Sequence, residues 1–376
     1  MPTTTTIDTL TELLSHLIRM PSITSEPGTN RAALDWVEEQ LSHLPLTIRR
    51  HDNAGHPCLI ATTPAVKDPK KPKIWLAGHI DVVPGTTADF EPVIKDGRIY
   101  GRGAYDMKYG IAVFVALLQE FGDDLADYDL GLMLTSDEEV GGYAGCGWLA
   151  KLGYTSEVML LPECGNPWDL ESGAKGISWW KLASTGKASH GARPWQGVNA
   201  IDQLVDYITE LRSHLPQEPC RTDHHQHHTL NVGTITGGRA TNQIADYAEA
   251  TVDVRYLPDT PPEQVEAWFS AAAAKFPGIS VIQLVAGEGF MTQQGGAVEL
   301  YKRLVKNVTG RTVTSTLAHA SSDARFFGAH GVQVITMPPD GGGQHSSGEW
   351  VGLEGLEHYY EITRQFVKEI AAPRQG

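Results

Sequence analysis

Apolar runs of strand length alternate with amphipathic segments in the first half of the chain, and this alternation constrains the fold more than any other feature. The runs that read as strands are IRRHD, PCLIATT, KIWLAGHID, DLGLMLTSDE and SEVMLLPE. Two segments between the last three of these runs, MKYGIAVFVALLQEFG and YAGCGWLAKLG, read as crossover helices. The last three runs are therefore predicted to be parallel neighbours. The pattern predicts an α/β domain with a mixed, mainly parallel sheet flanked by helices. Such sheets bind ligands at the carboxyl ends of their strands.

The pattern changes over residues 177–290, where the order becomes strand, helix, strand, strand, helix, strand. That order predicts a ferredoxin-like α+β domain, with two helices on one face of its sheet. The α/β alternation resumes afterwards and would add a strand and a helix to the first sheet. We therefore expect residues 1–176 and 291–376 to form one domain, interrupted by the domain of residues 177–290.

The composition predicts a water-soluble protein, with 41% hydrophobic and 20% charged residues and no apolar run of the ~20 residues that cross a bilayer. The Thr-rich start leads into an amphipathic pattern unlike a signal peptide, so we expect a cytoplasmic protein. The net charge of −15 disfavours nonspecific nucleic-acid binding. We expect neither a nucleic-acid nor a membrane partner.

The cysteines are expected to form no disulfide framework, and the densest group of histidines is expected to hold no metal. The four cysteines, Cys58, Cys146, Cys164 and Cys220, are scattered without a CxxC spacing and fit reduced thiols. The histidine-rich TDHHQHH follows two prolines and precedes a strand-like run, so it reads as a solvated loop.

Histidine and acidic residues instead follow the predicted strands. His79 ends one strand, and Asp81 two residues later could orient its ring, although a lone HxD is a weak motif. Asp106 lies in a Gly-rich loop at a helix start, where a helix N-cap is the alternative to a metal ligand. Each of these residues alone allows a purely structural reading.

The remaining candidates have the same ambiguity. Three adjacent acids, Asp137, Glu138 and Glu139, follow a buried strand and would repel one another unless cations or hydrogen-bond donors are near; a solvated turn is the alternative. Glu163 follows another apolar strand and His345 lies in a glycine-rich loop, where ordinary loop residues also occur.

Together, five residues occupy strand ends or the loops beyond them, namely His79, Asp106, Glu139, Glu163 and His345. One histidine and one carboxylate for each cation, with a further carboxylate shared, suits two zinc ions about 3.5–4 Å apart. No GxGxxG, GxxxxGK[ST] or GxSxG motif competes. The sequence therefore predicts a hydrolase with two divalent cations, for which we expect zinc, with cobalt able to substitute.

Six motifs resemble, in order and spacing, the dinuclear metallohydrolases that include succinyl-diaminopimelate desuccinylase, acetylornithine deacetylase, aminoacylase and glutamate carboxypeptidases. The motifs are GHIDVVPG, GRGAYDMKYG, TSDEEVGG, LLPECG, TGKASHGARPWQGVNAI and GQHSSGEW, and they span nearly the whole chain. The resemblance implies that the inserted domain is a lid or dimerisation domain.

The resemblance also implies roles for single residues. His79 and Glu163 would bind one zinc, Glu139 and His345 the other, and Asp106 would bridge them. Asp81 would hold His79, and the Asp106–Met107 peptide would be cis. Glu138 would act as the general base and return the proton to the leaving amine. His190 would polarise the scissile carbonyl in the neighbouring subunit of a homodimer.

Substrate recognition is expected to use a substrate carboxylate, because Arg193, Arg239, Arg255 and Arg325 could each bind one. We assign Arg255, Arg325 and Asn242 to substrate binding, although Arg255 could instead pair with Asp253 on the same strand face. The forms HASSDA and QHSSGEWV depart from the desuccinylase branch and leave succinyl-diaminopimelate open as a substrate.

The expected reaction is hydrolysis of an N-acyl amino acid or of a C-terminal peptide bond. A dipeptidase or aminopeptidase is the alternative among enzymes, and a catalytically silent ligand- or metal-binding homologue is the alternative of another class. Glu138 beside all five predicted ligands favours an active enzyme over a silent one.

Overall fold

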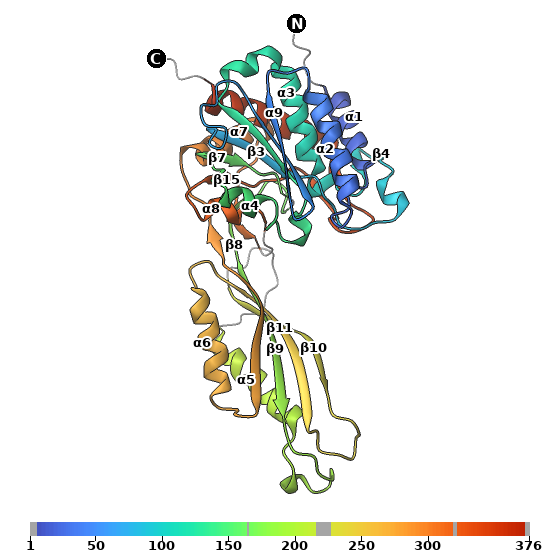
Figure 1. Ribbon diagram of the computed structural model, residues 1–376, viewed down its shortest axis with the longest axis vertical. Helices are drawn as coiled ribbons and strands as arrows, with labels where there is room; N and C mark the ends of the chain where they lie inside the picture. Colours follow the sequence, from blue (N-terminus) through green and yellow to red (C-terminus); the bar gives the residue numbers. More distant parts are fainter. Residues whose placement is uncertain (1–5, 164, 216–226, 319–321, 373–376) are drawn as a thin grey trace. The chain divides into compact units, whose positions relative to one another are not determined.

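The computed structural model describes residues 6–163, 165–215, 227–318 and 322–372. The chain divides into two compact units, each with its own sheet and core (Figure 1). The first unit comprises Met1–Ser172, Thr292–Thr316 and Ser322–Gly376, and the second comprises Gly173–Met291 and Leu317–Ser321.

The first unit is built on a six-stranded sheet with the order β1-β2-β6-β3-β7-β15. Its strands are β1 Thr47–Asn53, β2 His56–Thr62, β3 Ile74–His79, β6 Leu130–Thr135, β7 Val158–Leu160 and β15 Gln333–Ile335. Strand β3 pairs in parallel with both β6 and β7, and β7 pairs in parallel with β15, whereas the hairpin of β1 and β2 is antiparallel. The predicted mixed, mainly parallel sheet and its parallel neighbours are therefore confirmed.

Helices cover this sheet because its central strands are largely apolar. Every residue of β3 and β6 is buried, as expected of strands that are covered on both faces. The helices are α1 Ile7–Ile18, α2 Pro27–Leu41, α3 Tyr109–Phe121, α4 Cys146–Lys151, α7 Gly296–Thr309, α8 Arg325–Gly328 and α9 Leu353–Ala371. Helix α3 is buried along most of its length and contacts α1, α2, α9 and β3, which makes it the central helix of the unit (Figure 1).

Two small sheets were not predicted from the sequence. A four-stranded sheet has the order β16-β17-β5-β4, and a three-stranded sheet has the order β13-β8-β14. Their strands are β4 Val93–Lys95, β5 Arg98–Tyr100, β8 Leu170–Ala174, β13 Phe290–Met291, β14 Ser315–Ala318, β16 Gly341–Gly342 and β17 Trp350–Gly352. Most are only two to four residues long, too short for an alternating hydrophobic pattern to reveal them.

The second unit has the predicted β-α-β-β-α-β order. Its elements are β9 Gly176–Thr185, α5 Ala200–His214, β10 Thr229–Gly237, β11 Tyr247–Tyr256, α6 Pro262–Ala273 and β12 Ile279–Gly287. The sheet order β10-β11-β9-β12, antiparallel throughout, is ferredoxin-like. Alternate strand residues such as Trp180, Leu182 and Val252 pack with α5 and α6 in one core, so both helices cover the same face of the sheet.

Among the described residues, no helix has both the length and the apolar character needed to cross a membrane.

Candidate metal centre

His79 is the last residue of β3 and is almost completely buried. Its Nδ1 lies 3.0 Å from the main-chain carbonyl oxygen of Asp81, to which it can only donate a hydrogen bond. That bond selects the tautomer with the proton on Nδ1 and leaves the Nε2 lone pair free to bind a cation. Nε2 lies 3.2 Å from Oδ1 of Asp106 and 3.3 Å from Oε1 of Glu163.

Asp106 lies in a wide turn, Ala104–Lys108, that leads into α3, and its peptide bond to Met107 is cis, as the family resemblance implied. The two oxygens of its buried carboxylate face different histidines. Oδ2 lies 3.2 Å from Nε2 of His345, while Oδ1 faces His79. A carboxylate in this position can bridge two cations.

His345 lies in the loop between β16 and β17 with a φ of 61°, an uncommon value for a residue other than glycine. Its Nε2 lies 3.0 Å from Oε2 of Glu139, which follows β6. The His345 side chain is 53% exposed, whereas that of Glu139 is 6% exposed, so this half of the centre opens to solvent.

Glu163 follows β7 and is held between two anchored peptide groups. The Tyr109 hydroxyl donates to the carbonyl of Pro162 at 2.8 Å, and the Tyr105 hydroxyl donates to the carbonyl of Gly165 at 2.7 Å. Oε1 of Glu163 is buried, and no described residue donates a hydrogen bond to it while the proton of His79 is on Nδ1. A buried carboxylate oxygen without a donor is costly unless a cation completes its surroundings.

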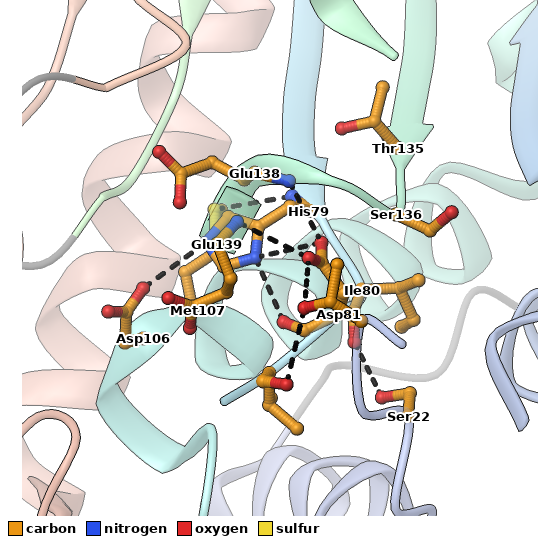
Figure 2. Close-up of polar contacts among 12 residues, drawn as sticks. Ser22, His79, Ile80, Asp81, Asp106, Met107, Thr135, Ser136, Glu138 and Glu139 are labelled. Atoms are coloured by element: carbon orange, nitrogen blue, oxygen red, sulfur yellow. Dashed lines mark hydrogen bonds and ion pairs between the residues drawn. The ribbon is translucent and has the colours of Figure 1, made fainter. Parts of the chain in front are cut away.

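The Asp81 carboxylate lies beside the His79 ring and makes further contacts that the sequence did not predict. Its Oδ1 is 3.4 Å from Nδ1 of His79, farther than the Asp81 carbonyl, so the main chain is the closer anchor of the ring. The carboxylate accepts hydrogen bonds from the Thr24 hydroxyl at 2.9 Å and from the peptide N–H groups of Glu138 and Glu139, both at 3.3 Å. Figure 2 shows Asp81 beside His79 and the turn at Glu138. Asp81 thus holds the turn that carries the predicted base.

The three adjacent acids after β6 separate into different environments. Asp137 is buried and accepts the N–H of Ala144 at 2.7 Å, so it fixes the following loop instead of joining the centre. Burial raises the pKa of Glu138 well above its usual range, and the nearby Glu163 carboxylate raises it further. A desolvated carboxylate of this kind is a strong proton acceptor once ionised.

The charges of the centre suit a bound cation. Burial opposes protonation of His79, but the surrounding carboxylates outweigh it and raise its pKa well above the usual value. Asp106 and Glu139 likewise raise the pKa of His345 to about 10. A proton on Nε2 of each ring would satisfy these acids, and a divalent cation in its place would do the same with more charge.

Two groups of candidate ligands emerge from the described residues, and they share Asp106. One is His79, Asp106 and Glu163, and the other is Asp106, Glu139 and His345. Within each group the ligand atoms lie within 4.8 Å of one another. The structure therefore brings together all five residues predicted as ligands, with nitrogen and oxygen donors of the kinds that zinc accepts.

Two of the other predicted residues lie together in the second unit. The peptide N–H of Gly191, next to His190, donates to the carbonyl of Asn242 at 2.8 Å, and His190 pairs with Gln243 in an isolated bridge. His190 and Asn242 are both exposed. The His190 ring accepts the N–H of Ala192 at 3.1 Å, which orients it within its loop.

The two predicted recognition arginines have protein partners. Arg255 lies near the end of β11, away from the loop that carries Asn242. Its Nε is 3.0 Å from Oδ1 of Asp253, so Arg255 forms the ion pair that the sequence offered as the alternative to substrate binding. Arg325 begins α8, donates to the carbonyl of Gly141 and stacks over the ring of Tyr143 at 5.1 Å. Arg325 therefore contacts the loop that follows Glu138 and Glu139.

Three charged residues near the centre were not predicted from the sequence. Glu349 is buried, pairs with Arg102 at 2.8 Å and accepts N–H groups of the turn at Asp106. Lys108 is buried and donates to the carbonyls of Leu17 and Met20, and burial lowers its pKa to about 7. In the sequence, each of these residues is a charged residue in or beside a motif, and charged residues at such positions are usually exposed to solvent. The sequence therefore offered no reason to single them out.

The structure describes only some of the four cysteines and of the histidine-rich segment. Cys58 and Cys146 are buried free thiols, as expected, whereas Cys164 and Cys220 lie outside the described residues. Of the histidine-rich segment, His224 and His225 also lie outside them. His228 accepts the N–H of Leu257 at 3.2 Å, so its ring is engaged with the main chain.

The chain is similar to known enzymes in sequence and in fold. Succinyl-diaminopimelate desuccinylase from a Caulobacter species is 32% identical over 338 residues, 84% of each chain. The same enzyme from Cereibacter sphaeroides is 31% identical over 381 residues, 96% of this chain and 98% of the relative. The crystal structure of aminopeptidase PepT from Bacillus cereus has a TM-score of 0.76 and 21% identity, covering 97% of this chain and 99% of the other, which shows a shared fold.

The fold and the centre define a metal-dependent amide or peptide hydrolase. The chain belongs to peptidase family M20/M25/M40, whose sequence profile matches residues 75–369. The family resemblance seen in the sequence motifs is confirmed.

Proposed function

We propose that the protein is a dinuclear zinc hydrolase in which His79 and Glu163 bind one cation, Glu139 and His345 bind the other, and Asp106 bridges them. The observation that carries this proposal is the division of the Asp106 carboxylate, whose two oxygens face Nε2 of two different histidines at 3.2 Å. The three ligand carboxylates concentrate negative charge that two divalent cations would neutralise. Cobalt, which accepts the same donors, is expected to replace zinc.

When bound, the cations supply an acidified water and a polarised substrate carbonyl. Glu138 takes the proton from the attacking water and gives it to the leaving amine, because its desolvated carboxylate has a raised affinity for protons. Asp81 keeps that base in place through the N–H groups of Glu138 and Glu139, and it fixes the His79 tautomer through its carbonyl.

The proposed substrate is an N-acyl amino acid or a peptide cleaved at its C-terminal bond. The names of the curated relatives, desuccinylases acting on an N-succinyl amino acid, support the acyl-amino-acid class. We assign the substrate carboxylate to Arg255 or Arg325 and a further polar contact to Asn242. The contact of Arg325 with Gly141, two residues from Glu139, supports a place for Arg325 near the reacting group.

We further infer that His190 polarises the substrate carbonyl and that it acts across a homodimer, with residues 177–290 as the lid and dimerisation domain. Exposure of the His190 ring supports a role toward a substrate, since a purely structural histidine is usually packed. The hydrogen bond between Gly191 and Asn242 supports a substrate-binding surface that the two loops share.

A substrate screen tests the proposal. Metal-free protein is loaded with zinc or cobalt and assayed against N-acetyl amino acids, N-succinyl amino acids and dipeptides, with amine release as the readout. We expect turnover of N-acyl amino acids or of peptides with a free C-terminal carboxylate. Turnover confined to dipeptides with a free amine would favour a dipeptidase or aminopeptidase, and binding without turnover would favour a silent homologue.

A further inference from the structure

Glu349 connects the two chain segments that carry Asp106 and His345. It lies four residues after His345, immediately before β17, and its side chain is 1% exposed. Oε1 accepts the peptide N–H of Tyr105 at 2.9 Å and that of Asp106 at 3.0 Å. One oxygen thus receives two consecutive main-chain donors of the turn that presents the bridging carboxylate.

The second oxygen binds a residue just before the same turn. Oε2 of Glu349 accepts from Nη1 of Arg102 at 2.8 Å, and the Arg102 side chain is 4% exposed. The main chain adds a further link, because the N–H of Gly101 donates to the carbonyl of Glu349 at 3.0 Å. The Glu349 side chain therefore holds the segment from Arg102 to Asp106 by both of its oxygens.

The peptide groups that Glu349 holds determine the geometry of Asp106. Tyr105 and Asp106 are both buried, so without Glu349 their N–H groups would lie away from water with no carboxylate to accept them. The turn would then relax, and the Asp106 oxygens would move relative to His79 and His345. An ordinary buried ion pair would stabilise the fold without affecting these distances in particular.

We propose that Glu349 is a positioning residue, which couples the His345 loop to the Asp106 turn and thereby sets the spacing of the two cation sites. The inference rests on the ligand roles proposed for Asp106 and His345. Residues that orient ligands typically contribute about 10- to 100-fold to metal affinity or activity.

The test compares Glu349→Ala, Glu349→Gln and a matched control, Glu120→Gln. Glu120 also accepts a hydrogen bond, from the Tyr360 hydroxyl, and faces an arginine, Arg364. It lies in the last turn of α3, roughly 16 Å along the helix from Tyr109 at about 1.5 Å per residue. The readouts are zinc affinity by competition with a chromogenic chelator, the visible spectrum of the cobalt-loaded protein, the Tm of the metal-free protein, and kcat and KM.

We expect Glu349→Ala to weaken zinc binding by about 10- to 100-fold, to change the cobalt spectrum, and to lower kcat with little effect on KM. Glu349→Gln keeps one acceptor oxygen but turns an amide N–H₂ toward Arg102, so its losses should be smaller, about 10-fold at most. Glu120→Gln should lower only the Tm. Glu349→Gln preserves the side-chain volume, so its zinc affinity and cobalt spectrum test the positioning role if Glu349→Ala does not fold.

Wild-type zinc affinity and cobalt spectrum in the Glu349 variants, with only a lower Tm, would overturn the positioning role alone. Failure of the wild-type protein to bind zinc would overturn the proposed function, and this inference with it.

Discussion

Oδ2 of Asp106 lies 3.2 Å from Nε2 of His345, although the two residues belong to motifs far apart in the sequence. The contact links the turn before α3 to the loop between β16 and β17. It makes Asp106 the shared member of both candidate ligand groups. The consequences of that sharing can be tested residue by residue.

Removal of metal should abolish turnover. Chelation is expected to leave a folded protein without activity, and reloading should restore activity at up to two zinc ions per chain, since two ligand groups share Asp106. Elemental analysis alongside an amine-release assay measures both quantities. Full activity in protein shown to be free of metal would contradict the prediction.

Glu138→Gln should separate binding from chemistry. The variant keeps the five ligand residues, so zinc content and Tm should match the wild type, while loss of the proton acceptor should lower kcat by about 10²- to 10⁴-fold. Steady-state kinetics and metal analysis provide the check. A kcat near that of the wild type would remove Glu138 from its assigned role.

His345→Ala, unlike Glu138→Gln, should lose bound zinc. Loss of its Nε2 leaves Glu139 and Asp106 without a nitrogen partner in one half of the centre, so about one zinc ion per chain should be lost. Zinc content after dialysis measures the effect, with Glu138→Gln as the control that retains metal. Retention of two zinc ions by His345→Ala would contradict its role as a ligand.

Mixing His190→Ala chains with Glu138→Gln chains tests the proposed dimer. If His190 acts in the partner's site, each mixed dimer regains one intact site, and random pairing gives up to about a quarter of wild-type activity. The assay follows mild dissociation and reassociation, with each variant alone as the control. Mixed dimers that recover no activity would exclude action across the dimer, and high activity of His190→Ala alone would exclude a catalytic role.

Glu171→Gln should stabilise the metal-free protein at alkaline pH. Glu171 lies in β8, where desolvation, assisted by repulsion from Glu163, raises its pKa to about 8 in the folded state. The folded protein therefore loses stability as pH rises from about 4.5 to about 8. The amide cannot ionise, and the variant should gain Tm at pH 8 but little at pH 5. Thermal unfolding at both pH values measures this difference, and an equal shift at both would exclude ionisation as the cause.

Much of the centre could be predicted because its residues follow strands with strong apolar patterns. The run LGLML before Asp137 and the run ending at His79 are buried parallel strands, whose carboxyl ends must meet at one edge of the sheet. Six motifs in order then identified the family. The sequence could not distinguish Asp137, which fixes a loop, from its neighbours Glu138 and Glu139, because adjacent acids have the same chemistry until burial separates them.

The sequence by itself determined the alternation of elements, the β-α-β-β-α-β order of the second unit and the residue types of the centre. Local periodicity and motif spacing depend only on neighbours along the chain, so they can be read without a structure. Only the tertiary structure decided that the Asp106 oxygens face two histidines, that Asp81 holds the turn of Glu138, and that Glu349 supports the Asp106 turn. These contacts join residues far apart in the chain, and their hydrogen bonds form only after the sheets and loops have brought buried donors and acceptors together.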